Sequence, residues 1–413
     1  MNPSQDNCVT PGLLAISEAE SRIQAAIQPI RDKQVLPLKH CLNRILSENI
    51  VAGFNIPRER HSSMDGYALA FTDLQNNIQA FRLAGTSWAG KPYTGTVQSG
   101  ECIRIFTGAV LPDTTDTVVI QEQVTESEGL IRFPGTTELG DNVRLPGDNV
   151  KQGSVVLETG SQLSPAEIGL LASLGKVSVQ VYRQLRVAFF STGDELRGLT
   201  DELQSGQLYD SNRYSLHALL EQTGVIPVDM GVVPDNPNQL SETLITAAKN
   251  SDLIISTGGA SVGDADFVQP VIEKIGQLQF WKLAIKPGKP LVFGEIQGTP
   301  FFGLPGNPVS VMVTFLVLVR QALYKQMGKR TCQPLQFEVP ITHTIQRKPG
   351  RQEYQRGLLT LDDNRLQVTP LKSQGSHILY SMISANCFII IPAECHTISE
   401  GQSVFVLPFK SEI

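Results

Sequence analysis

Four short segments between residues 191 and 310 bring glycines together with charged and hydroxyl side chains. They read STGDEL at 191–196, STGGASVGDAD at 256–266, KLAIKPGKP at 282–290 and GLPGNPVS at 303–310. Glycines allow backbone N–H groups to approach phosphate oxygens, and neighbouring carboxylates can hold Mg²⁺. Lysine ammonium groups and the free N–H groups at a helix start bind oxyanions. These segments therefore predict a site for a phosphate-bearing or oxyanionic ligand.

The elements around these segments would place them at one edge of a sheet. Apolar runs at 185–190, 253–256 and 290–294 predict buried strands, and helical patterns occur at 212–223, 239–249 and 308–323. Alternating strands and helices predict a doubly wound α/β sheet, in which ligands bind outside the carboxyl ends of the strands. STGDEL and STGGASVGDAD follow two of the predicted strands directly. STGDEL alone is also compatible with a tight turn that begins a helix.

The rest of the chain predicts three further regions. Apolar spacing at 14–49 predicts helices, and a helix at 164–174 begins with the capping sequence SPAE. Short strand-like runs between 51 and 150 predict a β-rich insertion, and strands after 331 predict a small β-barrel. We therefore expect a helical, discontinuous domain at 1–50 and 151–183, a β-rich inserted domain at 51–150, an α/β domain at 184–330 and a C-terminal β-barrel domain at 331–413.

Composition and charge exclude several functions. A net charge of −6 argues against a nucleic-acid partner, so an anionic ligand must meet a local cluster of positive groups. The six cysteines form no CxxC pair, which predicts reduced thiols, and the six histidines lack metal-ligand spacing, which argues against a zinc hydrolase. No GxxxxGK[ST] motif is present.

Two features bear on cellular location. The polar N-terminus lacks the apolar run of a signal peptide. The longest apolar stretch, 309–319, is too short to span a bilayer and predicts a buried helix. We therefore expect a cytoplasmic protein with no membrane partner.

The four segments, together with HSSMDGYA at 61–68, RIFTGA at 104–109 and GSH at 375–377, resemble the molybdopterin molybdenumtransferases of the MoeA and gephyrin family. The resemblance covers essentially the whole chain, in order. It implies an elongated four-domain homodimer whose α/β domain is of the molybdopterin-binding type. The active site would lie between the α/β domain of one subunit and the β-rich domain of the other. Adenylated molybdopterin would receive molybdenum from molybdate and release AMP with the help of a divalent cation.

The resemblance and the chemistry of the loops together assign roles to individual residues. Catalytic roles are expected for Asp65, Thr107, Glu195, Asp266, Lys282 and Lys286. Substrate binding is expected for Gly258, Gly259, Ser261, Lys289, Pro305, Gly306, Asn307, Pro308, Ser310, Arg356 and Ser376. Asp235 and Asp266 are expected to hold Mg²⁺. Lysine, arginine and serine side chains in this set can bind molybdate through charge-assisted hydrogen bonds.

One position departs from the family's pattern. The family usually shows Gly-x-Asp at the end of the β-rich domain, whereas this chain has an amide, Asn149, where that carboxylate is expected. Asn149 is therefore given no metal or base role, and Asp148 could substitute only if the loop shifts.

Three other functions stay open at this point: a gephyrin-like binding protein, a molybdopterin adenylyltransferase, and a protein that binds pterin without turnover. The first would need the extra domain and linker of gephyrin, and the second needs neither the barrel nor KPGKP. Further partners implied by the resemblance are the molybdopterin adenylyltransferase and acceptor molybdoenzymes.

Overall fold

The computed structural model describes residues 12–258, 268–330 and 334–410. The chain forms two compact units. Unit 1 comprises residues 1–47, 160–164 and 178–413, and unit 2 comprises residues 48–159 and 165–177. Unit 2 is thus an insertion in the sequence of unit 1. The finer division into four domains stays a prediction.

The centre of unit 1 is a six-stranded sheet in the order β16-β13-β17-β21-β20-β18. Its strands are β13 (Arg186–Thr192), β16 (Ile226–Val233), β17 (Leu253–Thr257), β18 (Gly276–Phe280), β20 (Val292–Ile296) and β21 (Thr299–Leu304). β13, β16, β17 and β21 are parallel, whereas β20 pairs antiparallel with both β21 and β18 at one side. The predicted α/β sheet is therefore confirmed in its parallel part, and a hairpin extends it.

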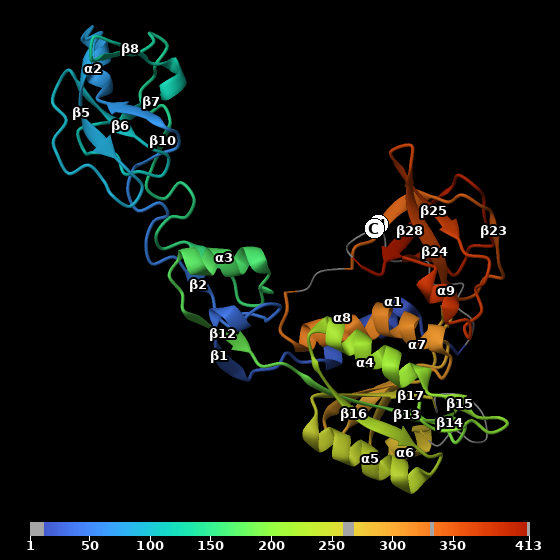
Figure 1. The fold of residues 1–413 in the computed structure, drawn as a ribbon. Helices are drawn as coiled ribbons and strands as arrows, with labels where there is room; N and C mark the ends of the chain where they lie inside the picture. Colours follow the sequence, from blue (N-terminus) through green and yellow to red (C-terminus); the bar gives the residue numbers. More distant parts are fainter. Residues whose placement is uncertain (1–11, 259–267, 331–333, 411–413) are drawn as a thin grey trace. The chain divides into compact units, whose positions relative to one another are not determined.

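Helices cover both faces of this sheet (Figure 1). α5 (Pro237–Asn250) and α6 (Val268–Ile275) pack on one face, and their apolar residues form a separate core cluster with Phe190, Ile254 and Phe301. α4 (Ser211–Thr223) and the long helix from residue 308 to 326 lie on the other face. Two-sided coverage explains why β13 and β17 are almost continuously apolar.

The long helix comprises α7 (Pro308–Thr314), a π-helical turn (Phe315–Val319) and α8 (Arg320–Gln326). It continues beyond the apolar run seen in the sequence and reaches 19 residues, so the expectation that it is too short to cross a membrane is wrong. However, 67% of its most apolar window is buried inside the protein, mainly in the core beneath the sheet. The prediction of a buried core helix is confirmed.

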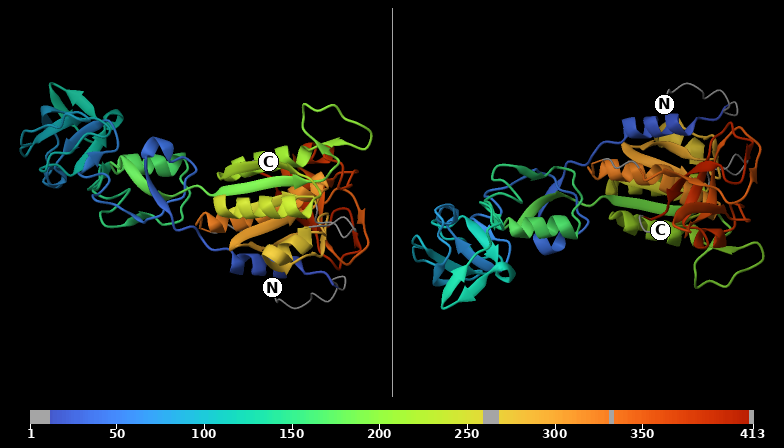
Figure 2. Two further views of the ribbon diagram at one scale, coloured as in Figure 1. Left: turned by 90° about the horizontal axis from the view of Figure 1, so that it is seen from below. Right: turned by 90° about the horizontal axis from the view of Figure 1, so that it is seen from above.

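The N-terminal segment is only partly helical. α1 (Ile16–Ala26) packs against α8 of the same unit, and both views in Figure 2 show it beside the α/β sheet. The second predicted helix is wrong, because β1 (Lys33–Pro37) pairs antiparallel with β12 (Ser178–Tyr182). Residues 33–37 alternate between exposed and half-buried, as a strand does, but this short alternation is recognised only once its distant partner is in place.

Most strands predicted after residue 331 form one sheet in the order β19-β24-β26-β28-β22, with β25 beside β24. The strands are β19 (Ile285–Lys286), β22 (Phe337–Pro340), β24 (Gln352–Asp362), β25 (Arg365–Pro370), β26 (Cys387–Ile391) and β28 (Ser403–Pro408), and a short helix, α9 (Tyr380–Ile383), lies before β26. A bridge between Ile341 and Val368 also links the end of β22 to β25. Closure into a full barrel stays a prediction. The parallel pairing of β19 with β24 attaches this sheet to the lysine segment.

Unit 2 contains a six-stranded sheet in the order β7-β4-β6-β5-β9-β8. Its elements are β4 (Gly66–Leu69), α2 (Phe71–Gln75), β5 (Phe81–Ser87), β6 (Glu101–Ile105), β7 (Thr117–Ile120), β8 (Thr125–Ser127) and β9 (Leu130–Arg132). Two further pairs of strands lie outside this sheet. β2 (Ile50–Val51) pairs with β11 (Val155–Leu157), and β3 (His61–Ser62) pairs with β10 (Val143–Arg144). α3 (Pro165–Ser173) confirms the helix that SPAE predicts. The β-rich character predicted for residues 51–150 is thus present.

Candidate active site

A cavity of about 890 Å³ lies in unit 1 at the carboxyl ends of the parallel strands. Thr192, Gly193 and Glu195 follow β13, Asp235 follows β16, and Gly258 follows β17. Pro305, Gly306, Asn307 and Ser310 follow β21. The carboxyl ends of parallel strands meet at one edge of a sheet, so these separate segments converge as the sequence predicts.

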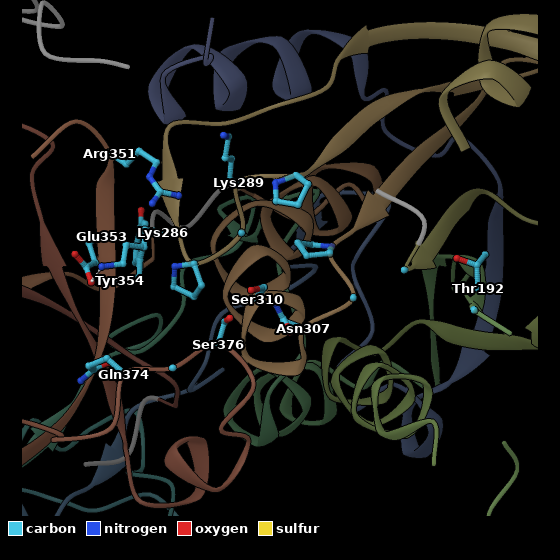
Figure 3. Close-up of a pocket in the computed structure, with 18 of the residues that line it drawn as sticks. Thr192, Lys286, Lys289, Asn307, Ser310, Arg351, Glu353, Tyr354, Gln374 and Ser376 are labelled. Carbon is cyan, nitrogen blue, oxygen red and sulfur yellow. Dashed lines mark ion pairs between the residues drawn. The ribbon is translucent and has the colours of Figure 1, made fainter. Parts of the chain in front are cut away.

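The opposite wall of the cavity comes from the lysine segment and the C-terminal sheet. Its lining residues are Lys286, Pro287, Gly288, Lys289, Pro290, Arg351, Glu353, Tyr354, Arg356, Gln374, Gly375 and Ser376. In Figure 3, Arg351, Lys286 and Glu353 lie together on one side, Ser310 and Ser376 in the middle, and Thr192 on the other side. The sequence analysis missed Arg351, Glu353, Tyr354 and Gln374 as lining residues. The RxExxR spacing at 351–356 could have indicated Arg351 and Glu353, since it puts two charges on β24 and a third just before it. Tyr354 and Gln374 carry no comparable signal in the sequence.

Gly258 allows two strand-end loops to approach closely. Its φ of +84° lies in the left-handed region, and a Cβ atom at this position would be 2.4 Å from the Thr192 carbonyl oxygen. Only glycine avoids both the backbone strain and the clash. The glycine expected to face a phosphate is therefore also required for the packing of the loop.

Lys286 is held by a buried carboxylate. Its Nζ lies 3.0 Å from Glu353 Oε1, and the Glu353 side chain is only 4% exposed. The other Glu353 oxygen, Oε2, lies 3.2 Å from Arg347 Nε, although the two are not aligned for a hydrogen bond. Gln355 also donates to Oε1 at 3.1 Å. Glu353 thus fixes the direction of Lys286, whose side chain remains about half exposed (48%) to the cavity.

Arg356 is a buried cation that organises the loop before α9. Its side chain is 1% exposed, and Nη2 donates to the carbonyls of Ser373 and Gly375, both at 3.1 Å, while Nε donates to Ser381 Oγ. Nη1 has no hydrogen-bond partner within the described part of the chain. Burial lowers the pKa of Arg356 to about 10, so it stays protonated at neutral pH. This arrangement holds Ser376 at the cavity and leaves one edge of the guanidinium for a ligand.

The acidic side of the cavity consists of Glu195 and Asp235. The loops that carry them are connected, because Asp194 N–H donates to Asp235 Oδ2 at 3.3 Å and Asp235 N–H donates to Asp194 Oδ1 at 3.2 Å. Within the ranges that the structure describes, no three acidic, histidine or cysteine side chains come together as a metal site. Mg²⁺ commonly binds through one or two carboxylates and completes its shell with substrate phosphates and water, so Asp235 fits such a partial site.

The start of α7 is partly occupied by the protein itself. Val309 N–H, one of the groups expected to be free, donates to the Ser376 carbonyl at 3.1 Å. Asn212 donates to the Gly306 carbonyl at 2.7 Å and so anchors the preceding turn. The buried Ser310 (3% exposed) lines the cavity one residue later. The helix start thus offers Ser310 to a ligand, and its first N–H holds the Ser376 loop.

Not every predicted residue lines this cavity. Lys282 lines a separate hollow with Phe280, Trp281 and residues 12–14, and Pro308 is half-buried and does not line the cavity. Gly259, Ser261 and Asp266 lie outside the described residues. Asp65 and Thr107 belong to unit 2.

Within unit 2, Asp65 and Thr107 form a pair. Asp65 Oδ1 accepts hydrogen bonds from Thr107 N–H at 2.7 Å and from Thr107 Oγ1 at 2.8 Å. These two donors lower the pKa of Asp65 below its ordinary value, the backbone donor being the stronger. Both residues are exposed, so the pair presents an ionised carboxylate, with Oδ2 available, to solvent.

The region around Asn149 contains a hollow within unit 2. His61, Arg144, Asp148 and Asn149 line a cavity of about 540 Å³. The Asp148 carboxylate accepts from Leu145 N–H at 2.7 Å and so closes its own turn. The side chain that could have replaced the expected carboxylate is therefore engaged locally.

A charged cavity at the carboxyl edge of a doubly wound sheet is typical of α/β enzymes that bind phosphorylated ligands. Three family profiles match the chain: the MoeA N-terminal region (domains I and II) at residues 14–175, a probable molybdopterin binding domain at 188–325, and the MoeA C-terminal region (domain IV) at 338–409. The chain belongs to the MoeA family of molybdopterin molybdenumtransferases. It is a transferase of this type, with a role in molybdenum cofactor biosynthesis.

Individual relatives match this chain along nearly its whole length. The molybdopterin molybdenumtransferase of Haemophilus influenzae is 41% identical over 401 residues, which cover 96% of this chain and 99% of that protein. The enzyme of the same name from Nostoc sp. is 36% identical and covers 91% of this chain and 89% of its own. The crystal structure of the molybdopterin biosynthesis MoeA protein from Pyrococcus horikoshii OT3 matches with a TM-score of 0.84 at 27% identity, covering 96% of this chain and all of that one. The multi-domain architecture is therefore that of MoeA.

Proposed function

We propose that this chain inserts molybdenum, supplied as molybdate, into adenylated molybdopterin and releases AMP with the help of Mg²⁺. The observation that carries this proposal is the composition of the unit 1 cavity, which is lined by four cations, Lys286, Lys289, Arg351 and Arg356, and by the carboxylates of Glu195 and Asp235. Such a division of charge suits a polyanionic substrate on one side and a metal-bound phosphate on the other.

Molybdate would bind at the cationic wall. Molybdate is a tetrahedral dianion, and Lys286, Lys289 and the free edge of Arg356 offer charged donors from different directions. The hydroxyls of Ser310 and Ser376 add neutral donors beside them. Because Glu353 already neutralises part of the Lys286 charge, we expect Lys286 mainly to orient the oxyanion.

The phosphates of the substrate would lie near the strand-end glycines. Gly258 and Gly306 line the cavity without a side chain, which lets backbone N–H groups approach phosphate oxygens. Asp235, with Asp266 from outside the described residues, would hold Mg²⁺ there. The ion would supply positive charge against the phosphate that leaves as AMP. Glu195, which lines the same cavity, is expected to act on this reaction. The catalytic role expected for Lys282 rests on the family resemblance alone, since Lys282 lines a separate hollow.

Asp65 and Thr107 would serve the same reaction from a partner subunit, since we propose a homodimer with composite sites. The Asp65 carboxylate, to which Thr107 donates two hydrogen bonds, is ionised and exposed, so it is able to contact a bound substrate. Mixing Asp65→Ala and Asp266→Ala subunits should then restore part of the activity, because one composite site in each heterodimer is intact. Sedimentation of a strictly monomeric protein at working concentration would contradict this.

The test of the proposed function is a turnover assay. Purified protein is incubated with adenylated molybdopterin, molybdate and Mg²⁺, and AMP is measured. We expect AMP release that requires molybdate and stops when the divalent cation is chelated. Binding of the substrate with no release of AMP would instead support the pterin-binding protein without turnover, the alternative that Asn149 favours.

Three further expectations accompany this proposal. The protein works in the cytoplasm, the adenylyltransferase supplies its substrate, and acceptor molybdoenzymes take its product. Co-purification of either partner with a tagged chain would test the last two.

A further inference from the structure

Unit 2 carries an exposed pair of stacked aromatic rings. The Trp88 and Phe106 rings lie with their centroids 4.0 Å apart and their planes 10° from parallel. Trp88 is 50% exposed although Phe106 covers one of its faces, so the other face is open to solvent. An exposed indole that is already stacked on one side has lost most of its freedom before any ligand binds, which lowers the entropic cost of binding.

The backbone around this pair is fixed. Trp88 and Lys91 exchange two hydrogen bonds, both of 3.0 Å, which close a tight hairpin. Phe106 N–H donates to the Ser87 carbonyl at 3.3 Å, so the hairpin is connected to the end of β6. Ser87 in turn donates through its hydroxyl to the Val110 carbonyl at 2.9 Å. The two rings are therefore set in a rigid frame.

Charged and polar groups surround the rings. The Arg104 guanidinium lies 5.0 Å from the Phe106 ring centroid and 4.9 Å from that of Tyr67, and it donates to the Gly66 carbonyl and to Gln121. Thr107, the residue after Phe106, is bonded to Asp65. The pair of stacked rings is thus next in sequence to the residue that holds Asp65, whose exposed oxygen Oδ2 can accept a hydrogen bond.

A flat ring with polar N–H groups at its edge can stack on the open face of Trp88 and donate to the Asp65 carboxylate, whereas an aliphatic ligand cannot donate to that carboxylate. We propose that Trp88 binds a planar, bicyclic nitrogen heterocycle of the substrate by stacking on its open face. This inference rests on the proposed function, whose substrate contains two such rings, pterin and adenine. A contact between two copies of the chain is the competing use of the same surface.

Tryptophan fluorescence can test the proposal directly. The chain has two tryptophans, Trp88 and Trp281, and Trp281 lies in unit 1. In a Trp281→Phe background, AMP and 6-hydroxymethylpterin are titrated separately as probes. We expect saturable quenching of Trp88 by at least one of them, and the stronger quencher identifies the ring.

Substitutions separate stacking from general packing. Stacking of one base on an aromatic side chain changes affinity by about ten- to a hundredfold. Trp88→Leu should weaken binding of the effective probe by that factor in calorimetry, whereas Trp88→Phe should retain most of it. Leu139→Ala, which removes another exposed apolar side chain of unit 2 (65% exposed), should leave it unchanged.

The proposal is overturned if neither probe quenches saturably, or if Trp88→Leu binds the probe as well as the unsubstituted protein does. A dimer that dissociates in Trp88→Leu while probe binding persists would assign the surface to subunit contact and equally overturn it. None of these measurements requires turnover. Failure of the proposed function is seen separately, as absence of molybdate-dependent AMP release from the unsubstituted protein.

Discussion

The cavity of unit 1 and the Asp65–Thr107 edge of unit 2 hold their charged groups in opposite ways. In the cavity, Lys286 and the Ser376 loop are positioned by buried charges, Glu353 and Arg356. In unit 2, Asp65 and Thr107 are both exposed and position each other through two short hydrogen bonds. The first arrangement depends on the interior of the protein, and the second depends only on a local turn.

This difference determines what a substitution should do. Where a buried charge supports a functional loop, removing it leaves buried polar groups unsatisfied, so stability and activity should fall together. Where an exposed pair does the positioning, solvent replaces lost hydrogen bonds, so activity or a pKa should change with little change in stability. Three substitutions in unit 1 and one in unit 2 test this distinction.

The largest effect is expected for Arg356→Met. The substitution removes the donors to the Ser373 and Gly375 carbonyls and leaves the buried Glu353 with one positive neighbour fewer. We expect the free energy of unfolding of unit 1 to fall by about 3–5 kcal/mol and activity to be lost. Chemical denaturation measures the first effect. Arg365→Met, an exposed arginine on β25, is the matched control and should change stability by less than about 0.5 kcal/mol. Equal effects of the two substitutions would show that Arg356 does not support the loop.

Gly258→Ala should come next. The added Cβ would lie 2.4 Å from a backbone oxygen at a residue whose φ is +84°. We expect a loss of about 2–4 kcal/mol in unfolding free energy and a displaced loop after β17. The control is Gly169→Ala inside α3, where no atom lies within 4 Å of the new Cβ. That change should stabilise unit 2 by up to about 1 kcal/mol. A stable, active Gly258→Ala variant would show that the loops do not need their close approach.

Lys286→Ala should affect molybdate use more than stability. Loss of one charge-assisted contact costs about 1.5–3 kcal/mol, so the molybdate concentration for half-maximal rate should rise by about ten- to a hundredfold. Excess molybdate should partly restore the rate, while binding of the adenylated substrate falls less. Lys249→Ala, an exposed lysine at the end of α5, controls for net charge. If substrate binding is lost while the molybdate dependence is unchanged, Lys286 contacts the pterin or the phosphates of the substrate and not molybdate.

The smallest effect is expected for Thr107→Val, which removes the hydroxyl donor to Asp65 and keeps the backbone one. The Asp65 pKa should rise towards its ordinary value without reaching it, because the backbone hydrogen bond is the larger cause of the lowered pKa. An acid whose pKa is lowered by folding adds stability above its unfolded pKa and loses it as pH falls through the folded pKa. The small loss of stability should therefore be present above about pH 4 and disappear as the pH falls below it, and carboxyl NMR titration of Asp65 measures the rise in its pKa. An unchanged pKa would mean that the hydroxyl does not contribute.

Local sequence determined a large part of this protein. The apolar runs at 185–190 and 253–256 predict β13 and β17, since strands covered on both faces are recognisable without knowledge of their partners. SPAE predicts the start of α3 because capping depends on neighbouring residues only. The position of Glu195 and Gly258 at the cavity follows in turn, because both come just after parallel strands.

Tertiary structure alone decided the rest. Lys286 and Glu353 are 67 residues apart, and only the pairing of β19 with β24 places them opposite each other. The same pairing brings Arg351 and Tyr354 to the cavity, and β12 converts a segment predicted as helix into strand β1. Spacing along the chain reports which face a residue occupies within its own element. It carries no information on which distant strand will supply the hydrogen bonds, and that choice completes the cationic wall of the site.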